Sequence, residues 1–199
     1  MSIYFHFVEG FGYPEPLKTP PRTKDSWKIY MICIKPYEKY SLIYADTARL
    51  EAKQKVVVPQ LFSSLLIATL SGQPLSAHYH KDGDCHPAFD MSYKDHEGRH
   101  KTITVYRIRQ DDLRLYFIYR SGNTIILLKL LPKFKGKLKS SDQTMIENLA
   151  RIVLRLKDPE QIRERPHAGR RGKGQGQRLP LLLRNARRDQ PRTGTSPRI

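Results

Sequence analysis

Arginine side chains recur at even spacings in two neighbouring apolar stretches of the sequence. Arg107 and Arg109 lie in TVYRIR, and Arg114 and Arg120 lie in LRLYFIYR. Alternate residues of a β-strand project from the same face, so a strand at residues 113–120 places Arg114 and Arg120 on one face of a sheet. The sequence offers neither arginine a carboxylate partner on its own strand. Unpaired cations on one sheet face form a site for an anion such as a phosphate.

A basic segment and two tyrosines extend this set. Lys133, Lys135 and Lys137 alternate directly after the last apolar stretch, where they can lie beside the arginine-bearing strands. Tyr116 and Tyr119 lie on the strand of Arg114 and could stack on a nucleic-acid base. For each cation the competing interpretation is a solvated surface, and for each tyrosine it is packing in the core.

The histidines and cysteines do not form a metal motif. His78 and His80 are followed by Cys85 and His86, but a structural zinc site usually has four ligands with a Cys-x-x-Cys element. We therefore expect no metal and no cofactor. His78 or His80 could act as a general acid, and the competing interpretation is a surface loop.

The pattern of apolar residues predicts the elements that would position these side chains. Strand-forming residues, helical spacing and capping residues predict the following order: a strand at 27–34, a helix from Asp46 or Thr47 to Lys55, a helix beginning near Pro59, strands at 102–109, 113–120 and 124–131, and a helix from Ser140 with a capping box to Gln143. In the last helix Met145, Ile146, Leu149, Ile152, Val153 and Leu156 form one apolar stripe. The fold class is α+β: an N-terminal strand and helical hairpin, a three-stranded antiparallel meander and a closing helix.

The same pattern divides the chain into three parts. Residues 1–25 are proline-rich and predict an extended arm. Residues 26–157 predict one folded domain, within which residues 73–101 lack periodicity and predict a long loop with at most a short strand. Residues 158–199 hold 11 Lys and Arg against 4 Asp and Glu. This tail is rich in glycine and predicts a disordered basic segment.

Charge and cysteine content limit the class of protein. The formal net charge is +17, which favours a polyanionic partner, first of all nucleic acid. Two cysteines cannot form a disulfide scaffold, so a reducing, cytoplasmic location is expected. No apolar run approaches the ~18 residues of a membrane span, and we expect no secretory signal and no membrane partner.

The strand, helix pair, meander and closing helix, with VYRIR, LRLYFIY, GNTIILLK and the basic segment from Lys133 to Lys137, resemble the RelE/ParE superfamily of type II toxin–antitoxin toxins, including its HigB-like members. The chain departs from that family in its length, its loop at 73–101 and its basic tail. The resemblance implies a metal-independent endoribonuclease, a hydrolase that cuts mRNA on the ribosome and is held inactive by a cognate antitoxin protein.

The resemblance also implies roles for the residues introduced above. Cations would stabilise the phosphorane, and acid and base groups would move two protons. Candidate catalytic residues are Arg114 and Arg120 as phosphate clamps, Lys133 or Lys135 as a base if neighbouring cations lower its pKa, and Tyr119. Candidate RNA-binding residues are Arg107, Arg109, Tyr116 and Lys137.

Two other functions fit the same sequence. A ParE-like toxin would inhibit gyrase by binding it, without cutting RNA. A non-enzymatic nucleic-acid-binding protein of a mobile element would use the sheet and the basic tail. Cations on strands and on the segment after them, in addition to those in the tail, favour a shaped RNA site over these alternatives.

Overall fold

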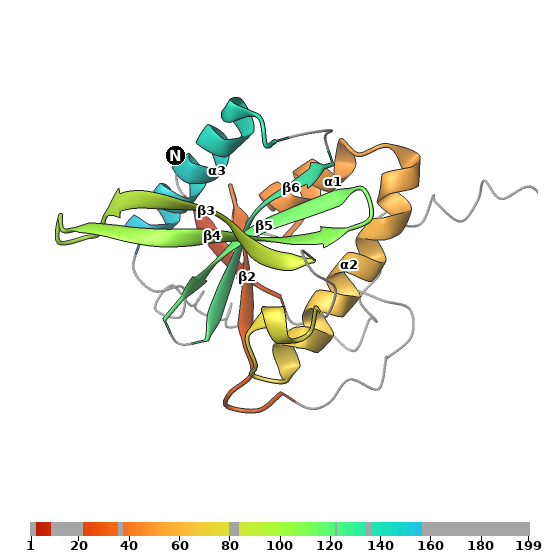
Figure 1. The fold of residues 1–199 in the computed structure, drawn as a ribbon, viewed down its shortest axis with the longest axis horizontal. Coiled ribbons are helices and arrows are strands. Elements are labelled where there is room, and N and C mark those ends of the chain that lie inside the picture. Colours follow the sequence, from red (N-terminus) through yellow and green to blue (C-terminus); the bar gives the residue numbers. More distant parts are fainter. Residues whose placement is uncertain are drawn as a thin grey trace, which may run out of the picture.

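One mixed β-sheet of six strands carries the described part of the chain (Figure 1). The computed structural model describes residues 3–8, 22–35, 38–79, 84–121, 123–133 and 137–156. The strands are β1 (Tyr4–Phe7), β2 (Lys28–Cys33), β3 (Cys85–Lys94), β4 (His100–Gln110), β5 (Leu113–Arg120) and β6 (Thr124–Pro132). They lie in the order β1-β2-β6-β5-β4-β3, with β2 parallel to β6 and every other neighbouring pair antiparallel. The predicted α+β class is confirmed.

Helices cover both faces of this sheet. In the described residues they are α1 (Leu42–Ala48), α2 (Ala52–Leu70) and α3 (Ser140–Arg155), with single 3₁₀ turns at Glu38–Tyr40 and Leu75–Ala77. We call the face covered by α1 and α2 the α2 face, and the opposite face, covered by α3, the α3 face. The two faces hold separate clusters of buried apolar side chains.

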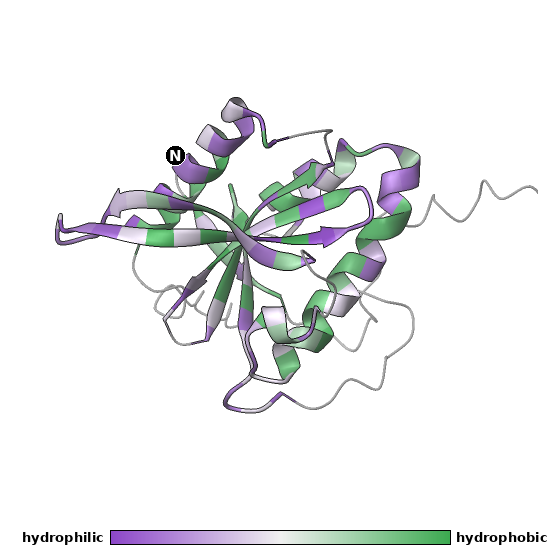
Figure 2. Ribbon diagram, in the orientation of Figure 1, coloured by the Kyte–Doolittle hydropathy of each residue, from purple (hydrophilic) through white to green (hydrophobic). Residues whose placement is uncertain are grey.

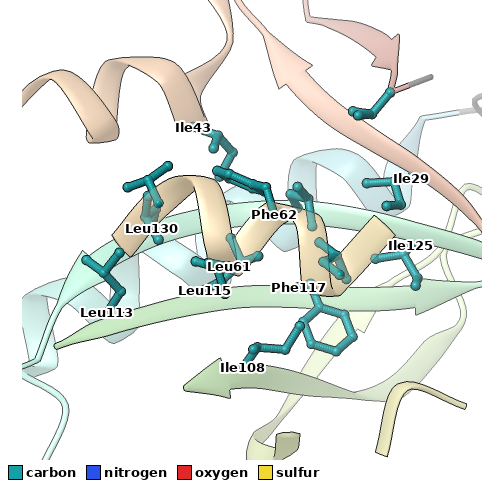
Figure 3. Close-up of a cluster of buried hydrophobic side chains, with 14 of the residues drawn as sticks. Ile29, Ile43, Leu61, Phe62, Ile108, Leu113, Leu115, Phe117, Ile125 and Leu130 are labelled. Carbon is teal, nitrogen blue, oxygen red and sulfur yellow. The ribbon is translucent and has the colours of Figure 1, made fainter. Parts of the chain in front are cut away.

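The core of the α2 face forms between α2 and the central strands. Leu61 and Phe62 of α2 are buried over Leu115 and Phe117 of β5 (Figure 3). On the α3 face, Ile146 of α3 packs in a cluster with Tyr116 and Ile118 of β5, which alternate with Leu115 and Phe117. A strand buried on both faces needs a nearly continuous apolar sequence, which β6 has; it is green along much of its length in Figure 2. β5 is also buried on both faces over most of its length, although its sequence includes Arg114.

A buried ion pair joins α1 to β6. The pairing of β2 with β6 ends at Met31 and Leu127, and α1 packs against the remainder of β6. The Asp46 carboxylate of α1 accepts hydrogen bonds from the Lys129 ammonium and from the backbone N–H of Leu130. The open edge of β6 is therefore closed by a helix side chain, and Asp46 does not cap a helix as the sequence predicts.

The helix boundaries differ from the predicted ones. Ser41 caps α1 by accepting from the N–H of Ile43, and α2 runs from Ala52 through Pro59 without a break. A proline inside a helix costs about 3 kcal/mol. Its buried neighbours Val58 and Leu61 supply apolar burial that offsets this cost.

Two strands lie where the sequence predicts none or only a short one. β1 falls inside the predicted N-terminal arm and pairs with β2, and β3 is a ten-residue strand inside the predicted loop at 73–101. β3 lies at an edge of the sheet and has a register shift between Pro87 and Phe89. An edge strand is half exposed and tolerates proline at an irregularity, so its sequence lacks the apolar run of a central strand. The predicted sheet was therefore too small.

The apolar stripe of α3 is only partly buried. Ile146 and Val153 are buried as predicted, whereas Met145 is 45% and Ile152 43% exposed. Ala150 and Leu154 occupy core positions that the predicted stripe did not include. The helix begins at Ser140 with Lys139 as N-cap, and the Gln143 amide donates to Glu147, so the predicted capping box does not form.

Some predictions concern residues outside the described part of the chain. They are most of the N-terminal arm, Lys135, His80 and the basic tail from residue 158. A separate observation bears on membranes: within the described residues, no helix has the length and apolar character needed to cross a bilayer.

Candidate anion-binding site

Three arginines come together on the α3 face where β4 turns into β5. In the antiparallel pairing of these strands, Arg109 lies opposite Arg114, and Arg107 lies opposite Tyr116. Arg107 and Arg109 are two residues apart and so project from the same face. We call Arg107, Arg109 and Arg114 the arginine cluster.

Arg114 is the most buried member of the arginine cluster. Its side chain is folded over the turn, where Nη1 donates to the carbonyls of Asp111 at 3.1 Å and Leu113 at 2.7 Å. Burial lowers the pKa of Arg114, and the neighbouring charges of Arg109 and Arg107 lower it further, against weaker opposing effects that include Asp112. The fold thus holds a guanidinium where its positive charge is disfavoured, which is a common property of ligand-binding sites.

Arg107 contacts a histidine on the adjacent strand. His86 of β3 lies directly opposite Arg107, and the Arg107 Nε–H donates to His86 Nε2 at 3.1 Å. The other ring nitrogen, Nδ1, is 2.7 Å from the Pro87 carbonyl. Both side chains are half-buried, so an approaching ligand can reach them.

The residue that follows β6 adds a further cation at the same end of the strands. Pro132 pairs with Leu113, and the next residue, Lys133, donates its backbone N–H to the Asp112 carbonyl at 2.6 Å. The Lys133 side chain is exposed. Because β6 pairs with β5, the backbone of Lys133 lies one strand away from Arg114.

Among the described residues, no carboxylate lies within ion-pair distance of the arginine cluster. The carboxylates that do pair with cations lie elsewhere, for example Asp95 with Lys101 and Glu147 with Arg151. An anion bound at the cluster would offset the mutual repulsion of three guanidinium groups, and a phosphate can accept bidentate hydrogen bonds from each.

Arg120 is separated from this site although it lies on the same face of β5. Six residues of strand span about 20 Å, so one phosphate cannot contact both Arg114 and Arg120. The Arg120 guanidinium donates to the carbonyls of Val153 at 3.3 Å and Leu156 at 3.2 Å. These are carbonyls at the C-terminal end of α3, where a cation is favoured by the helix dipole. The predicted clamp of two arginines does not form in this arrangement.

The predicted tyrosines do not lie with the arginines as accessible side chains. Tyr119 projects to the α2 face, where its hydroxyl accepts from the N–H of Leu75 and its ring contacts Trp27 and Phe117. Burial raises the pKa of Tyr119. Tyr116 lies on the α3 face beside the arginine cluster, but it is only 2% exposed and packs in the core, which leaves no ring face for stacking.

The remaining predicted residues are dispersed. Lys137 is exposed just before α3, and Lys135 lies outside the described part of the chain. His78 contacts the Ser71 hydroxyl at 2.5 Å near the C-terminal end of α2. In the described ranges, no three His, Cys, Asp or Glu side chains are grouped so that they could hold a metal ion.

His86 is the site residue that the sequence analysis missed. The sequence presents it only as a possible zinc ligand beside Cys85, because residues 73–101 lack periodicity and predict a loop. Once β3 is present, its antiparallel pairing with β4 places His86 against Arg107. The register shift between Pro87 and Phe89 interrupts alternation in this strand: Cys85 packs in the α2-face cluster, whereas both Ala88 and Phe89 pack against the α3-face cluster, so no regular pattern marks His86 in the sequence.

Comparisons with known proteins give no relative. No family model, no curated protein and no solved structure matches the chain.

Proposed function

We propose that the protein is an RNA-cleaving toxin of a type II toxin–antitoxin system, a metal-independent endoribonuclease whose arginine cluster binds an RNA phosphate. The observation that carries the proposal is the grouping of Arg107, Arg109 and Arg114 without a carboxylate partner among the described residues. The sequence resemblance set out above supports the choice of RNA and of cleavage. The mRNA of a translating ribosome is the proposed substrate, and an antitoxin is the proposed protein partner.

The cluster is suited to the charge that develops during RNA cleavage. When a 2′ oxygen attacks the adjacent phosphorus, negative charge builds on the phosphoryl oxygens. Fixed cations in a partly water-excluded site stabilise this charge more than they stabilise the ground state. Arg114 is held in place by the carbonyls of the turn, and Arg107 and Arg109 lie beside it, so the three cations are already grouped before RNA binds.

The test uses the purified full-length chain, single-stranded RNA and EDTA to remove divalent cations. We expect cleavage in EDTA with 2′,3′-cyclic phosphate ends, and we expect Arg107→Ala together with Arg109→Ala to reduce cleavage by at least a hundredfold. The matched control is Arg151→Ala together with Arg155→Ala, which removes the same charge from the surface of α3. Equal losses in the two double variants would contradict a specific site.

A parallel experiment in bacteria separates the alternative functions. Induction of the chain should arrest growth and produce ribosome-bound mRNA fragments without a DNA-damage response. DNA damage without mRNA fragments would favour the gyrase-inhibiting toxin. RNA binding without cleavage or growth arrest would favour the non-enzymatic nucleic-acid-binding protein.

A further inference from the structure

The two hydrogen bonds that His86 makes assign one tautomer to its ring. The Pro87 carbonyl can only accept, so His86 Nδ1 must carry the proton of their 2.7 Å contact. The Nε–H of Arg107 can only donate, so Nε2 must accept across 3.1 Å. The lone pair of Nε2 therefore points at Arg107 of the arginine cluster, and an imidazole nitrogen with a lone pair can accept a proton as a general base.

We propose that His86 is the general base of RNA cleavage at the arginine cluster, an inference that rests on the proposed function. Arg107 occupies the lone pair of Nε2 in the free protein. When a phosphate binds, Arg107 can turn its donor towards the phosphoryl oxygens and leave Nε2 free for the adjacent ribose. The fold thus keeps the base and the phosphate-binding cation on directly opposed positions of β3 and β4.

The proposed step is an intramolecular transesterification of the RNA phosphodiester. His86 Nε2 takes the proton of the 2′-hydroxyl, and the 2′ oxygen forms a bond to the adjacent phosphorus. The bond from phosphorus to the 5′ oxygen breaks, and that oxygen takes a proton from water. The products are a 2′,3′-cyclic phosphate and a free 5′-hydroxyl, and His86 returns its proton to solvent.

The elements packed near His86 carry several charged side chains. From β4 it faces Arg107, with Arg109 two residues further, and from β5 Arg114 lies beyond them. On the α3 helix, Glu147 is paired with Arg151. Two residues before His86 lies Asp84. Burial raises the pKa of Tyr79, which packs against the α2-face cluster, and the negative charge of Asp84 adds to this effect. Asp112, in the turn before β5, acts on Arg114. Of all these groups, Arg107 is the one in contact with Nε2.

The test compares His86→Gln with the wild-type chain across pH. Glutamine keeps a hydrogen-bonding side chain but cannot accept a proton at neutral pH. We expect cleavage of RNA at pH 7 to fall by about a hundredfold to ten-thousandfold, the usual contribution of a general base. The rise of the cleavage rate with pH at its acid limb should disappear in the variant. The matched control is His100→Gln, an exposed histidine at the other end of β4, which should keep both rate and pH profile.

Binding separates this inference from the proposed function. A 2′-O-methyl version of the same RNA cannot be cleaved, and His86→Gln should bind it within about twofold of the wild-type affinity, with an unchanged circular dichroism spectrum. A variant that cleaves at the wild-type rate, or that keeps the acid limb, overturns the role of His86 and leaves the proposed function standing. Failure of the wild-type chain to cleave RNA overturns both.

Discussion

β4 carries cationic side chains near both of its ends, and their surroundings are opposite. At the β3–β4 hairpin, Lys101 and Arg99 contact the Asp95 carboxylate, each at 3.0 Å. At the other end, Arg107 and Arg109 lie beside Arg114 without a carboxylate in the described part of the chain. The hairpin extends beyond the rest of the sheet in Figure 1, where its tip is exposed. The cations at the β3–β4 hairpin are therefore paired with a carboxylate, whereas those at the β4–β5 end of the strand are not.

Two further cations show that the fold can provide acceptors when a cation serves stability. Lys129 is largely buried and pairs with Asp46, and Arg120 donates to carbonyls at the end of α3. In the arginine cluster, Arg114 and Arg107 also have hydrogen-bond acceptors, but three guanidinium groups lie together without a carboxylate partner among the described residues. Uncompensated charge costs stability and is retained at sites that bind a ligand. The difference therefore separates cations that hold the fold together from cations for which we propose an anionic ligand.

The largest effect should come from the Asp46–Lys129 pair. Lys129→Met leaves the Asp46 carboxylate buried without its cation, and we expect the free energy of unfolding to fall by about 3–5 kcal/mol. Urea unfolding measures this loss. The double variant Asp46→Asn, Lys129→Met should regain most of it, because neither residue is then charged. A double variant as unstable as the single one would show that the ion pair is not the cause.

Arg120→Ala should have the next largest effect, on stability alone. It removes two charge-assisted hydrogen bonds to the last turn of α3, each of a kind that contributes about 1.5–3 kcal/mol. We expect the free energy of unfolding to fall by about that amount for the pair, since part of the loss is recovered by water. RNA affinity should stay within about twofold. A large loss of RNA binding by a folded variant would move Arg120 into the binding site.

Arg109→Met should have the opposite sign. The substitution keeps an apolar stem but removes one of three like charges, and relief of unfavourable charge commonly adds about 0.5–2 kcal/mol to stability. We expect the midpoint of urea unfolding to rise or stay unchanged while RNA binding weakens. A clear loss of stability would mean that Arg109 is paired within the fold, as Lys129 and Arg120 are.

The smallest effect should be local and acidic. Burial would raise the pKa of Asp95, but hydrogen bonds from Lys101 and from Arg99 outweigh it, so the pKa lies well below its usual range. A lowered carboxyl pKa stabilises the folded hairpin above the ordinary aspartate pKa of about 3.9 and loses this contribution as pH falls through that value and below. The amide N–H groups of Glu97 and Arg99, which donate to Asp95, should keep their NMR shifts down to about pH 3, below the ordinary aspartate pKa. A titration midpoint near the ordinary value of about 3.9 would contradict the lowered pKa.

The sequence was informative where strands are central and helices are periodic. All four predicted strands fall within two residues of β2, β4, β5 and β6, because a strand buried on both faces or alternating regularly leaves a clear pattern. β1 and β3 lie at the edges of the sheet and carry mixed polar sequences, so periodicity could not find them. The course of α2 through Pro59 depends on packing against β5, which no local pattern encodes.

The site was predictable in part. Alternation correctly put Arg114 and Arg120 on one face of β5, and it could not show that the end of α3 lies against Arg120. The opposition of Arg109 and Arg114 depends on the turn at Asp111 and Asp112, where Asp111 has a φ of 46°. The sequence predicts a three-residue turn at 110–112, whereas the turn in the structure consists of Asp111 and Asp112. A turn one residue shorter changes the partner of every residue across β4 and β5.

The salt dependence of RNA binding tests the central claim most directly. For single-stranded nucleic acid, the slope of log K against log salt falls by about 0.7 for each phosphate that a cation neutralises. Arg107→Ala together with Arg109→Ala should therefore reduce the slope by about 1.4. The surface double variant Arg151→Ala, Arg155→Ala should leave it nearly unchanged. An equal reduction in both variants would show that RNA responds to net charge, and would contradict an anion site at the arginine cluster.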